Sequence, residues 1–239
     1  MSPEDRIIIA LDTPIVEKAM DLSSKIRDKV SYFKIGKEIF TSAGPDAVIK
    51  IKQSGVKVFL DLKYHDIPNT VAKAGIAAAS LGADMFNVHA SGGLEMMKKC
   101  AGEVKDFCAK KNIAPPLIIA VTILTSIPEE RLNKELNMPG PLIDRVLLLA
   151  ELAKKSGLDG VVCSPAEIKS VKENIGSDFL TVSPGIRPSW AARNDQARIT
   201  TPAEAVAAGG DYLVIGRPVT ASEDPSAAAA KILDEIRNQ

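Results

Sequence analysis

The segment Phe59-Leu60-Asp61-Leu62-Lys63 places two opposite charges inside a run of apolar residues. Because side chains of a β-strand alternate between its faces, Asp61 and Lys63 share one face and the two leucines share the other. An ammonium kept charged by nearby carboxylates can stabilise developing negative charge or deliver a proton. The pair could instead be a salt bridge that closes the end of a core.

Three further charged residues lie in or after short apolar runs: Asp12, Lys34 and Asp66. Burying several charges is costly unless they are paired, and a core selected for stability alone would carry Val or Ile at such positions. A convergent group of two lysines and three aspartates therefore indicates a functional site.

Eight short β-rich runs recur along the chain, separated by Ala/Lys/Glu-rich segments. They are 7–12, 32–36, 58–63, 85–90, 117–124, 160–164, 179–184 and 212–216. Several are nearly continuous Val/Ile/Leu runs, typical of parallel strands covered by helices. Eight strand–helix units in 239 residues predict an α/β fold, a (β/α)8 TIM barrel. No linker or change of composition divides residues 1–239, so we expect one domain.

Helix-start patterns support this division. Thr13-Pro14 resembles an N-cap followed by proline at the first helical position. Ser164-Pro-Ala-Glu167 and Thr201-Pro-Ala-Glu204 both match a capping box. An open doubly wound sheet is the alternative fold, but no Gly-x-Gly-x-x-Gly follows the first predicted strand.

Composition excludes several classes of protein. With 46% hydrophobic and 25% charged residues the chain is not disordered, and 30 basic against 30 acidic residues argue against nucleic-acid binding by bulk charge. No apolar run approaches the roughly 18 residues of a membrane span, and no cationic leader is evident. The odd set of Cys100, Cys108 and Cys163 lacks a CxxC spacing, which favours reduced core thiols in a cytoplasmic protein.

Two features near the carboxyl end of the chain suggest an anion site. The connection at about 184–200 is long enough to be a lid, and a glycine–arginine pair follows the last predicted strand. Barrel enzymes often hold phosphate after strands seven and eight, so a phosphorylated substrate is expected. A solvated insertion with incidental arginines is the alternative. The residues concerned are Arg187, Trp190, Arg193, Gln196, Arg198, Gly216 and Arg217.

Metal chemistry is not expected from the residues present. His65 and His89 are the only histidines, and Lys63 competes with any cation for the Asp61 carboxylate. No Ser/His/Asp arrangement and no P-loop is evident. We therefore do not expect a metal site.

Residues 61–70, Asp-Leu-Lys-Tyr-His-Asp-Ile-Pro-Asn-Thr, closely resemble the signature of the orotidine 5'-phosphate decarboxylase family. That signature is Asp-x-Lys-x-x-Asp followed by Ile/Pro-Asn-Thr. The resemblance continues through Ala-Leu-Asp at 10–12, Phe-Lys-Ile-Gly at 33–36, Val-Thr-Ile-Leu-Thr-Ser at 121–126, Pro-Gly-Ile-Arg-Pro at 184–188, Asn-Asp-Gln at 194–196 and Gly-Arg-Pro at 216–218.

The resemblance implies a homodimeric barrel that converts orotidine 5'-monophosphate to uridine 5'-monophosphate (UMP) and CO₂ in de novo pyrimidine synthesis, without cofactor or metal. It implies that Lys63 is the proton donor within an alternating network of Lys34, Asp61, Lys63 and Asp66. The resemblance implies that Asp12 and Lys34 contact the ribose and that Thr125 or Ser126 contacts the pyrimidine. It implies that the phosphate is held by Arg187, Gln196, Gly216 and Arg217, and that Asp61 and Pro184 also lie in the site. It further implies that Asp66 and Thr70 reach into the partner subunit's site.

Two other functions remain as alternatives. Hexulose-phosphate synthases and ketogulonate-phosphate decarboxylases share Asp-x-Lys-x-x-Asp but use Mg²⁺, tend to carry an acidic residue where this chain has Lys34, and lack Pro-Asn-Thr. A non-catalytic barrel that binds nucleotide phosphates would need no proton donor at Lys63. A scaffolding protein, in turn, would not need an arginine-rich lid.

Overall fold

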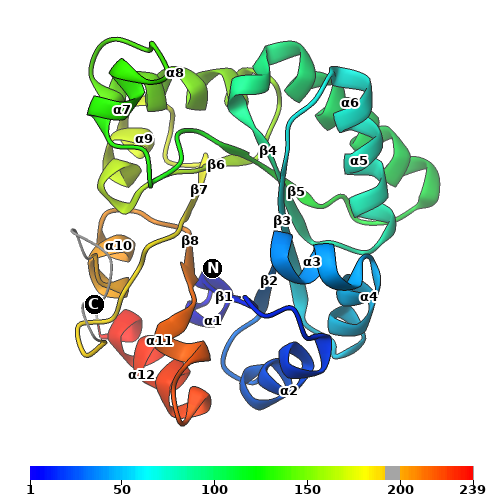
Figure 1. Cartoon of the computed structure of the whole chain (residues 1–239), viewed down its shortest axis with the longest axis vertical. Coiled ribbons are helices and arrows are strands. Elements are labelled where there is room, and N and C mark those ends of the chain that lie inside the picture. The colour runs from blue at the N-terminus through cyan, green and yellow to red at the C-terminus, as the bar shows by residue number, and fades with distance from the viewer. Residues whose placement is uncertain (192–199, 239) are drawn as a thin grey trace.

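A closed parallel barrel organises the chain. The computed structural model describes residues 1–191 and 200–238, and within them eight strands pair in chain order, with β8 closing onto β1. Helices surround the barrel (Figure 1), which confirms the predicted (β/α)8 fold. The strands are β1 (Ile7–Ala10), β2 (Tyr32–Gly36), β3 (Lys57–Tyr64), β4 (Met85–His89), β5 (Leu117–Val121), β6 (Gly160–Val162), β7 (Leu180–Ser183) and β8 (Tyr212–Ile215).

Most strands end before the predicted carboxyl boundary, because the last residues of those runs leave the sheet and enter the loops at its end. The helices are α1 (Pro3–Arg6), α2 (Val16–Ile26), α3 (Lys37–Ala43), α4 (Asp46–Gln53), α5 (Pro68–Ser80), α6 (Gly93–Lys111), α7 (Glu129–Lys134), α8 (Leu142–Lys155), α9 (Ile168–Asn174), α10 (Pro202–Ala207), α11 (Arg217–Thr220) and α12 (Pro225–Arg237), with 3-10 turns η1 (Ala90–Gly92) and η2 (Pro165–Glu167).

The predicted helix starts are partly correct. Both capping boxes are present, at Ser164 before η2 and at Thr201 before α10. The prediction at Thr13 is wrong, since α2 begins at Val16 after an extended Ile15. The Thr13 hydroxyl instead accepts a hydrogen bond from the Ile15 backbone N–H (3.3 Å), so it stabilises a turn ahead of the helix.

Two apolar clusters fill the fold. A small cluster inside the barrel consists of Ile8, Tyr32, Phe59, Met85, Ile119, Val182 and Tyr212. A large cluster lies between strands and helices and includes Leu60, with Leu62 packed against it. The leucines of β3 therefore face the helices, as expected. All three cysteines are buried and free, and burial raises the thiol pKa of Cys100 and Cys163 to about 12, consistent with inert core residues.

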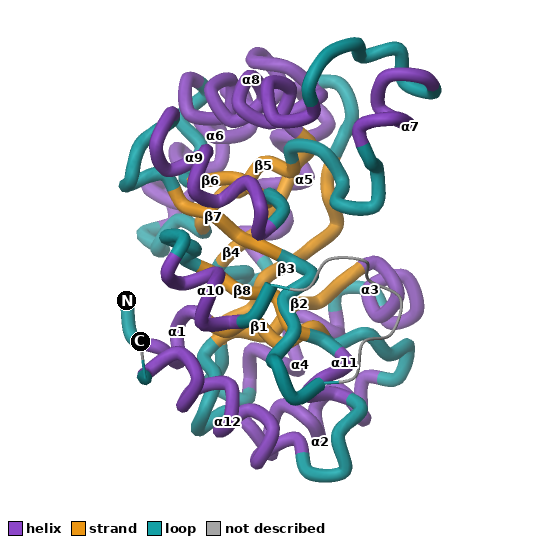
Figure 2. Tube along the Cα trace, turned by 90° about the vertical axis from the view of Figure 1, so that its left-hand side faces the viewer, coloured by secondary structure: helices purple, strands orange, loops and turns teal. Residues whose placement is uncertain are grey.

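The amino-terminal end of the barrel carries a repeated Gly-x-Asp motif before β4, β6 and β8. Its aspartates, the basal aspartates, are Asp84, Asp159 and Asp211, each two residues after a glycine with φ of 81°, 79° or 96°. Each carboxylate accepts a hydrogen bond from a backbone N–H of the preceding strand region, at Val58 (2.7 Å), Ile118 (2.7 Å) or Thr181 (2.8 Å). Both chain ends lie on this side (Figure 2).

In the described part of the chain, no helix combines the length and apolar character needed to cross a membrane.

Candidate active site

A cavity of about 240 Å³ opens at the carboxyl ends of the strands. It is lined by residues of β2, β3, β5, β6, β7 and β8 and the loops that follow them: Lys34, Phe59, Asp61, Lys63, Val121, Ile123, Leu124, Thr125, Ser126, Val162, Val182, Pro184 and Val214. Six predicted site residues therefore share one cavity. Its wall combines apolar residues with the charged Lys34, Asp61 and Lys63, a lining typical of a small-molecule site.

Four of the predicted charged residues form a continuous chain of opposite charges. The Lys34 ammonium lies 3.1 Å from Asp12 Oδ1 and 3.5 Å from Asp61 Oδ2. The Lys63 ammonium lies 2.6 Å from Asp61 Oδ1. Asp61 is only 9% exposed, so its carboxylate is held between two cations in a largely desolvated position.

The electrostatic balance at Asp61 keeps its carboxylate ionised. Burial acts to raise the pKa, but the attraction of Lys34 and Lys63, together with hydrogen bonds from Lys63 and Asn87, lowers it below the ordinary aspartate value. The ionised carboxylate holds both ammonium groups at the cavity wall.

The backbone at Lys63 departs from regular β-strand geometry. Its φ is +55°, a left-handed conformation that is uncommon outside glycine. The register between β3 and β4 pairs Leu60 with Phe86 and then Tyr64 with Val88, so three residues of β3 face one of β4. The predicted strand does run through Lys63, and Asp61 and Lys63 meet at the cavity as predicted, although the strand is irregular between Leu60 and Tyr64.

Asn87 is a site residue that the sequence analysis missed. It is fully buried in β4, donates from Nδ2 to Asp61 Oδ1 (2.7 Å) and accepts at Oδ1 from the Lys63 backbone N–H (2.8 Å). The available signal is its position two residues after Met85 in an otherwise apolar strand, which puts an amide on the barrel interior.

Gly36 makes room for the Lys34 ammonium at the end of β2. A Cβ at this position would lie 3.1 Å from Lys34 Nζ and 3.7 Å from Asp12 Oδ1. Any side chain would crowd the ion pair, so the bare backbone lets Lys34 bridge Asp12 and Asp61.

Asp66 and Thr70 lie outside this cavity. Both are exposed, and Asp66 Oδ1 accepts a hydrogen bond from the Ile67 backbone N–H (2.6 Å). The Ile67 side chain between them is 66% exposed. Within one chain, the fourth member of the predicted Lys/Asp network therefore does not join Lys34, Asp61 and Lys63.

The two histidines lie together beside the site. Their ring centroids are 5.4 Å apart, and burial, the neighbouring His65, Lys37 and Lys63 lower the pKa of His89, so His89 is neutral at pH 7. Among the described residues, no group of three or more His, Cys, Asp or Glu side chains is arranged to hold a metal ion.

The expected phosphate residues lie at the rim after β7 and β8. Arg187 is buried, and its backbone N–H donates to the Thr200 carbonyl (3.1 Å), which joins the two described ends of the 184–200 connection. Gly216 lies beside Asp12, and exposed Arg217 begins α11. Gln196, like Arg193 and Arg198, lies outside the described residues.

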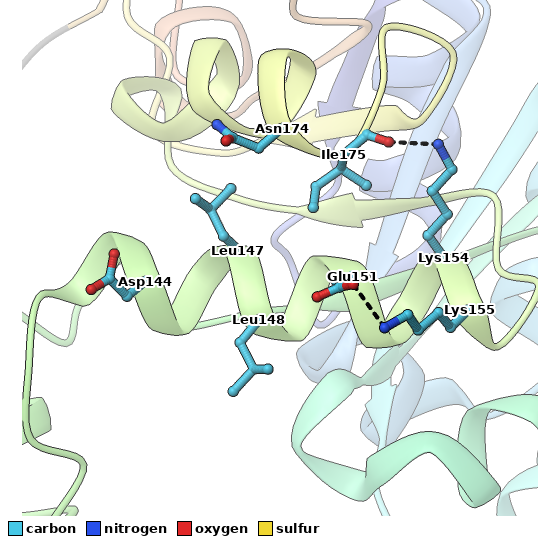
Figure 3. Close-up of a pocket in the computed structure, with 8 residues that line it drawn as sticks. All are labelled: Asp144, Leu147, Leu148, Glu151, Lys154, Lys155, Asn174 and Ile175. Atoms are coloured by element: carbon cyan, nitrogen blue, oxygen red, sulfur yellow. Dashed lines mark hydrogen bonds and ion pairs between the residues drawn. The ribbon is translucent and has the colours of Figure 1, made fainter.

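A larger hollow of about 760 Å³ lies on the surface between α8 and α9. Its side chains are spread along an open face, and three of its charged groups already have partners: Lys155 pairs with Glu151 (2.7 Å) and Lys154 donates to the Ile175 carbonyl (Figure 3). With no convergent set of reactive groups, this hollow is a poorer candidate site than the barrel cavity.

Comparison with known proteins identifies the family of this chain. Residues 5–232 match the family model described as "Orotidine 5'-phosphate decarboxylase / HUMPS family". The chain is 52% identical to the orotidine 5'-phosphate decarboxylase of Syntrophotalea carbinolica, over 97% of this chain and 94% of that protein. It is 52% identical to that of Geobacter metallireducens, over 97% and 96%.

Solved structures give the same result. The crystal structure of orotidine 5'-phosphate decarboxylase from Lactobacillus acidophilus superposes with a TM-score of 0.86 at 42% identity, covering 97% of this chain and 99% of that one. An uncharacterized conserved protein from Geobacillus kaustophilus superposes with a TM-score of 0.83 at 39% identity, covering 96% and 99%. This chain therefore belongs to the orotidine 5'-phosphate decarboxylase / HUMPS family.

Proposed function

We propose that this chain decarboxylates orotidine 5'-monophosphate to UMP and CO₂, the last step of de novo pyrimidine synthesis. The observation that carries the proposal is the Asp61 carboxylate held between the Lys34 and Lys63 ammonium groups at the cavity wall. The relatives at about half identity over nearly the whole chain carry the name of this activity, which favours it over the Mg²⁺-dependent branch.

The reaction breaks the bond between a pyrimidine ring carbon and its carboxylate. The electron pair stays on the ring carbon as CO₂ leaves, and the ring carbon then takes a proton. The Lys63 ammonium stabilises this developing negative charge and donates the proton, while Asp61 keeps Lys63 protonated. If the substrate carboxylate lies about 4 Å from Asp61, their repulsion is about 4 kcal/mol at an effective dielectric of 20, and departure of CO₂ relieves it.

The remaining roles concern substrate binding. Asp12 and Lys34, joined at 3.1 Å, are suited to the ribose hydroxyls. Thr125 or Ser126 on the cavity wall would meet the pyrimidine, and Pro184, which also lines the cavity, would contact the substrate. At the rim, Arg187, Gly216 and Arg217 would hold the phosphate, and Gln196 stays a prediction. Phosphate binding would place the reacting ring by contacts remote from it.

We further propose that residues 1–239 act as one barrel domain within a cytoplasmic homodimer. Exposed Asp66 and Thr70 flank the exposed Ile67 side chain, and docking of these residues on a second copy would complete the partner's Lys/Asp network. Light scattering should give twice the chain mass. Mixing inactive Lys63→Ala and Asp66→Ala chains should restore part of the activity, because one mixed site would then be intact. A monomeric, active enzyme would contradict this arrangement.

The activity test follows the loss of orotidine 5'-monophosphate absorbance with EDTA present and no cofactor added. We expect conversion to UMP by the wild-type chain. Lys63→Ala should keep the fold and UMP binding but lose turnover, since the proton donor is gone. No conversion by a folded dimer would overturn the proposal, and activity that appears only with Mg²⁺ and a sugar phosphate would assign the chain to the other branch. UMP binding without any turnover would indicate a non-catalytic binding protein.

A further inference from the structure

Asn87 is an amide in the middle of an apolar strand. Its neighbours Phe86 and Val88 belong to the cluster that faces the helices, whereas Met85 belongs to the barrel interior. Because alternate residues of a strand share a face, Asn87 points to the interior. Packing alone does not require an amide there, since a buried polar group is unfavourable unless it is hydrogen-bonded.

The nitrogen and the oxygen of this amide both form hydrogen bonds, each to a different residue of the charged site. Nδ2 donates to Asp61 Oδ1 at 2.7 Å, and Oδ1 accepts from the Lys63 backbone N–H at 2.8 Å. A carboxylate only accepts and a backbone N–H only donates, so these partners fix which way the amide points. Asp61 Oδ1 thus receives both Asn87 and the Lys63 ammonium, and Oδ2 remains for Lys34 at 3.5 Å.

The hydrogen bond to Lys63 replaces a bond that the strand ladder cannot make. Three residues of β3 face Asn87 alone, because the register passes from Leu60–Phe86 to Tyr64–Val88. Within that interruption Lys63 adopts φ +55°. A non-glycine residue stays in such a conformation only where its surroundings stabilise it. The hydrogen bond from the Lys63 backbone N–H to Asn87 Oδ1 stabilises this conformation directly.

We propose that Asn87 is a positioning residue that holds the Lys63 backbone and the Asp61 carboxylate so that ammonium and carboxylate meet the reacting carbon together. This inference rests on the proposed decarboxylation. Asn87 acts through Lys63 and Asp61. Its loss therefore affects the chemical step more than substrate binding, because Asn87 bonds to Lys63 and Asp61 and the phosphate contacts proposed at the rim are remote from β4.

Asn87→Leu tests the proposal by removing both hydrogen bonds while it keeps the branching and the number of heavy atoms of the side chain. A displacement of about 1 Å at reacting groups can lower turnover about 100-fold, so we expect kcat to fall about 100-fold while KM changes less than about threefold. Thr181→Val is the matched control, since Thr181 is also fully buried and hydrogen-bonded, to Asp211 at the opposite end of the barrel. It should keep the wild-type kcat even if its melting temperature falls.

Asn87→Asp separates positioning from a merely structural role, because it keeps the shape and changes only the charge. An ionised carboxylate at 87 would repel Asp61 and could not donate to it, whereas a protonated one can donate to Asp61 and still accept from the Lys63 N–H. We expect kcat of this variant to recover as the pH is lowered, over a range where wild-type kcat does not rise.

The outcomes are distinguishable from failure of the proposed function. Absence of wild-type turnover would contradict decarboxylation itself. With an active wild type, a folded Asn87→Leu with unchanged kcat, or an Asn87→Asp whose kcat follows the wild-type pH profile, would overturn the role of Asn87. If Asn87→Leu does not fold, the pH profile of Asn87→Asp decides, and failure of both to fold would assign Asn87 a structural role only.

Discussion

The two ends of the barrel both place aspartates against lysines and amides, but they use them differently. At the amino-terminal end, Asp211 accepts from the Thr181 backbone N–H (2.8 Å) and from Lys172 (2.6 Å). At the carboxyl end, Asp61 accepts from the side chains of Lys63 and Asn87. At the amino-terminal end the aspartate is therefore bonded to the backbone of the sheet. At the carboxyl end its partners are side chains, whose other hydrogen-bonding groups face the cavity.

The pKa values of two aspartates reflect this difference. Asp159, whose carboxylate accepts from the Ile118 and its own backbone N–H, has a raised pKa because burial around the carboxyl group outweighs those bonds, although the residue as a whole is exposed. At Asp61 two ammonium groups reverse the balance and lower the pKa. A neutral amide satisfies a carboxylate, whereas paired cations also hold it in the charged form.

The largest effect that we expect from this difference between the two ends is on kcat. Asp61→Asn should lower kcat about 100- to 1000-fold, the usual scale for losing one electrostatic group in a site. Asp211→Asn, at the other end, should leave the kcat of the folded fraction unchanged. Steady-state absorbance assays with the folded fraction measured by circular dichroism check both. Equal losses would show that the two ends do not differ in function.

For the free energy of unfolding we expect the reverse, with the larger effect at the amino-terminal end of the barrel. Asp211→Ala leaves the Lys172 ammonium, whose side chain is 12% exposed, without its carboxylate and the Thr181 N–H without its acceptor. We expect the free energy of unfolding to fall by about 3 kcal/mol, measured by urea denaturation. The control is Asp178→Ala, because Asp178 is 84% exposed in its ion pair with Lys154, and its loss should cost less than about 0.5 kcal/mol.

Arg217→Ala tests whether, at the carboxyl end of the barrel, the residues that bind the substrate are distinct from those that carry out the reaction. Losing a charge-assisted hydrogen bond to phosphate costs about 2 kcal/mol, so KM should rise about 30-fold with a smaller change in kcat. Arg131→Ala is the control, since Arg131 pairs with Glu135 on exposed α7. An unchanged KM for Arg217→Ala would remove Arg217 from the phosphate site.

The smallest effect concerns pH. The folded pKa of Asp61 lies below its unfolded value, so between the two the unfolded chain binds more protons and stability falls as the pH drops. Asp61→Asn should flatten this acid limb, by about 1.4 kcal/mol for each pKa unit. Asp159 has the opposite sign, since its raised pKa makes stability fall as the pH rises above the ordinary aspartate value. Urea denaturation of the wild type, Asp61→Asn and Asp159→Asn from pH 3 to pH 7 measures both effects, and identical changes of slope in the two variants would contradict the assignment.

The fold was predictable because hydrophobic runs record which residues lie between strands and helices. Every predicted strand is present, and the face assigned to Leu60 is correct. The helix start at Thr13 was not predictable from Thr-Pro alone, because Ile15 stays extended and delays the helix.

The site was predictable where charge interrupts an apolar pattern, as at Lys34 and Asp61. The period-two pattern could have placed Asn87 on the barrel interior, but its role depends on an irregular register between two strands, which that pattern does not reveal. Asp66 and Thr70 carry a motif whose proposed use requires a second chain, so the roles assigned to them stay predictions.

The Gly-x-Asp motif has a consequence for how the barrel opens. Its aspartates connect β3 with β4, β5 with β6, and β7 with β8 by a side-chain bond in addition to the strand ladder. We therefore expect each of these pairs to open as a unit, and the amide protons of Val58, Ile118 and Thr181 to exchange with solvent more slowly than other amides at the amino-terminal end of the barrel. Transient opening would then begin at the boundaries between the pairs, which leaves Asp61, Lys63 and Asn87 together within the β3–β4 unit.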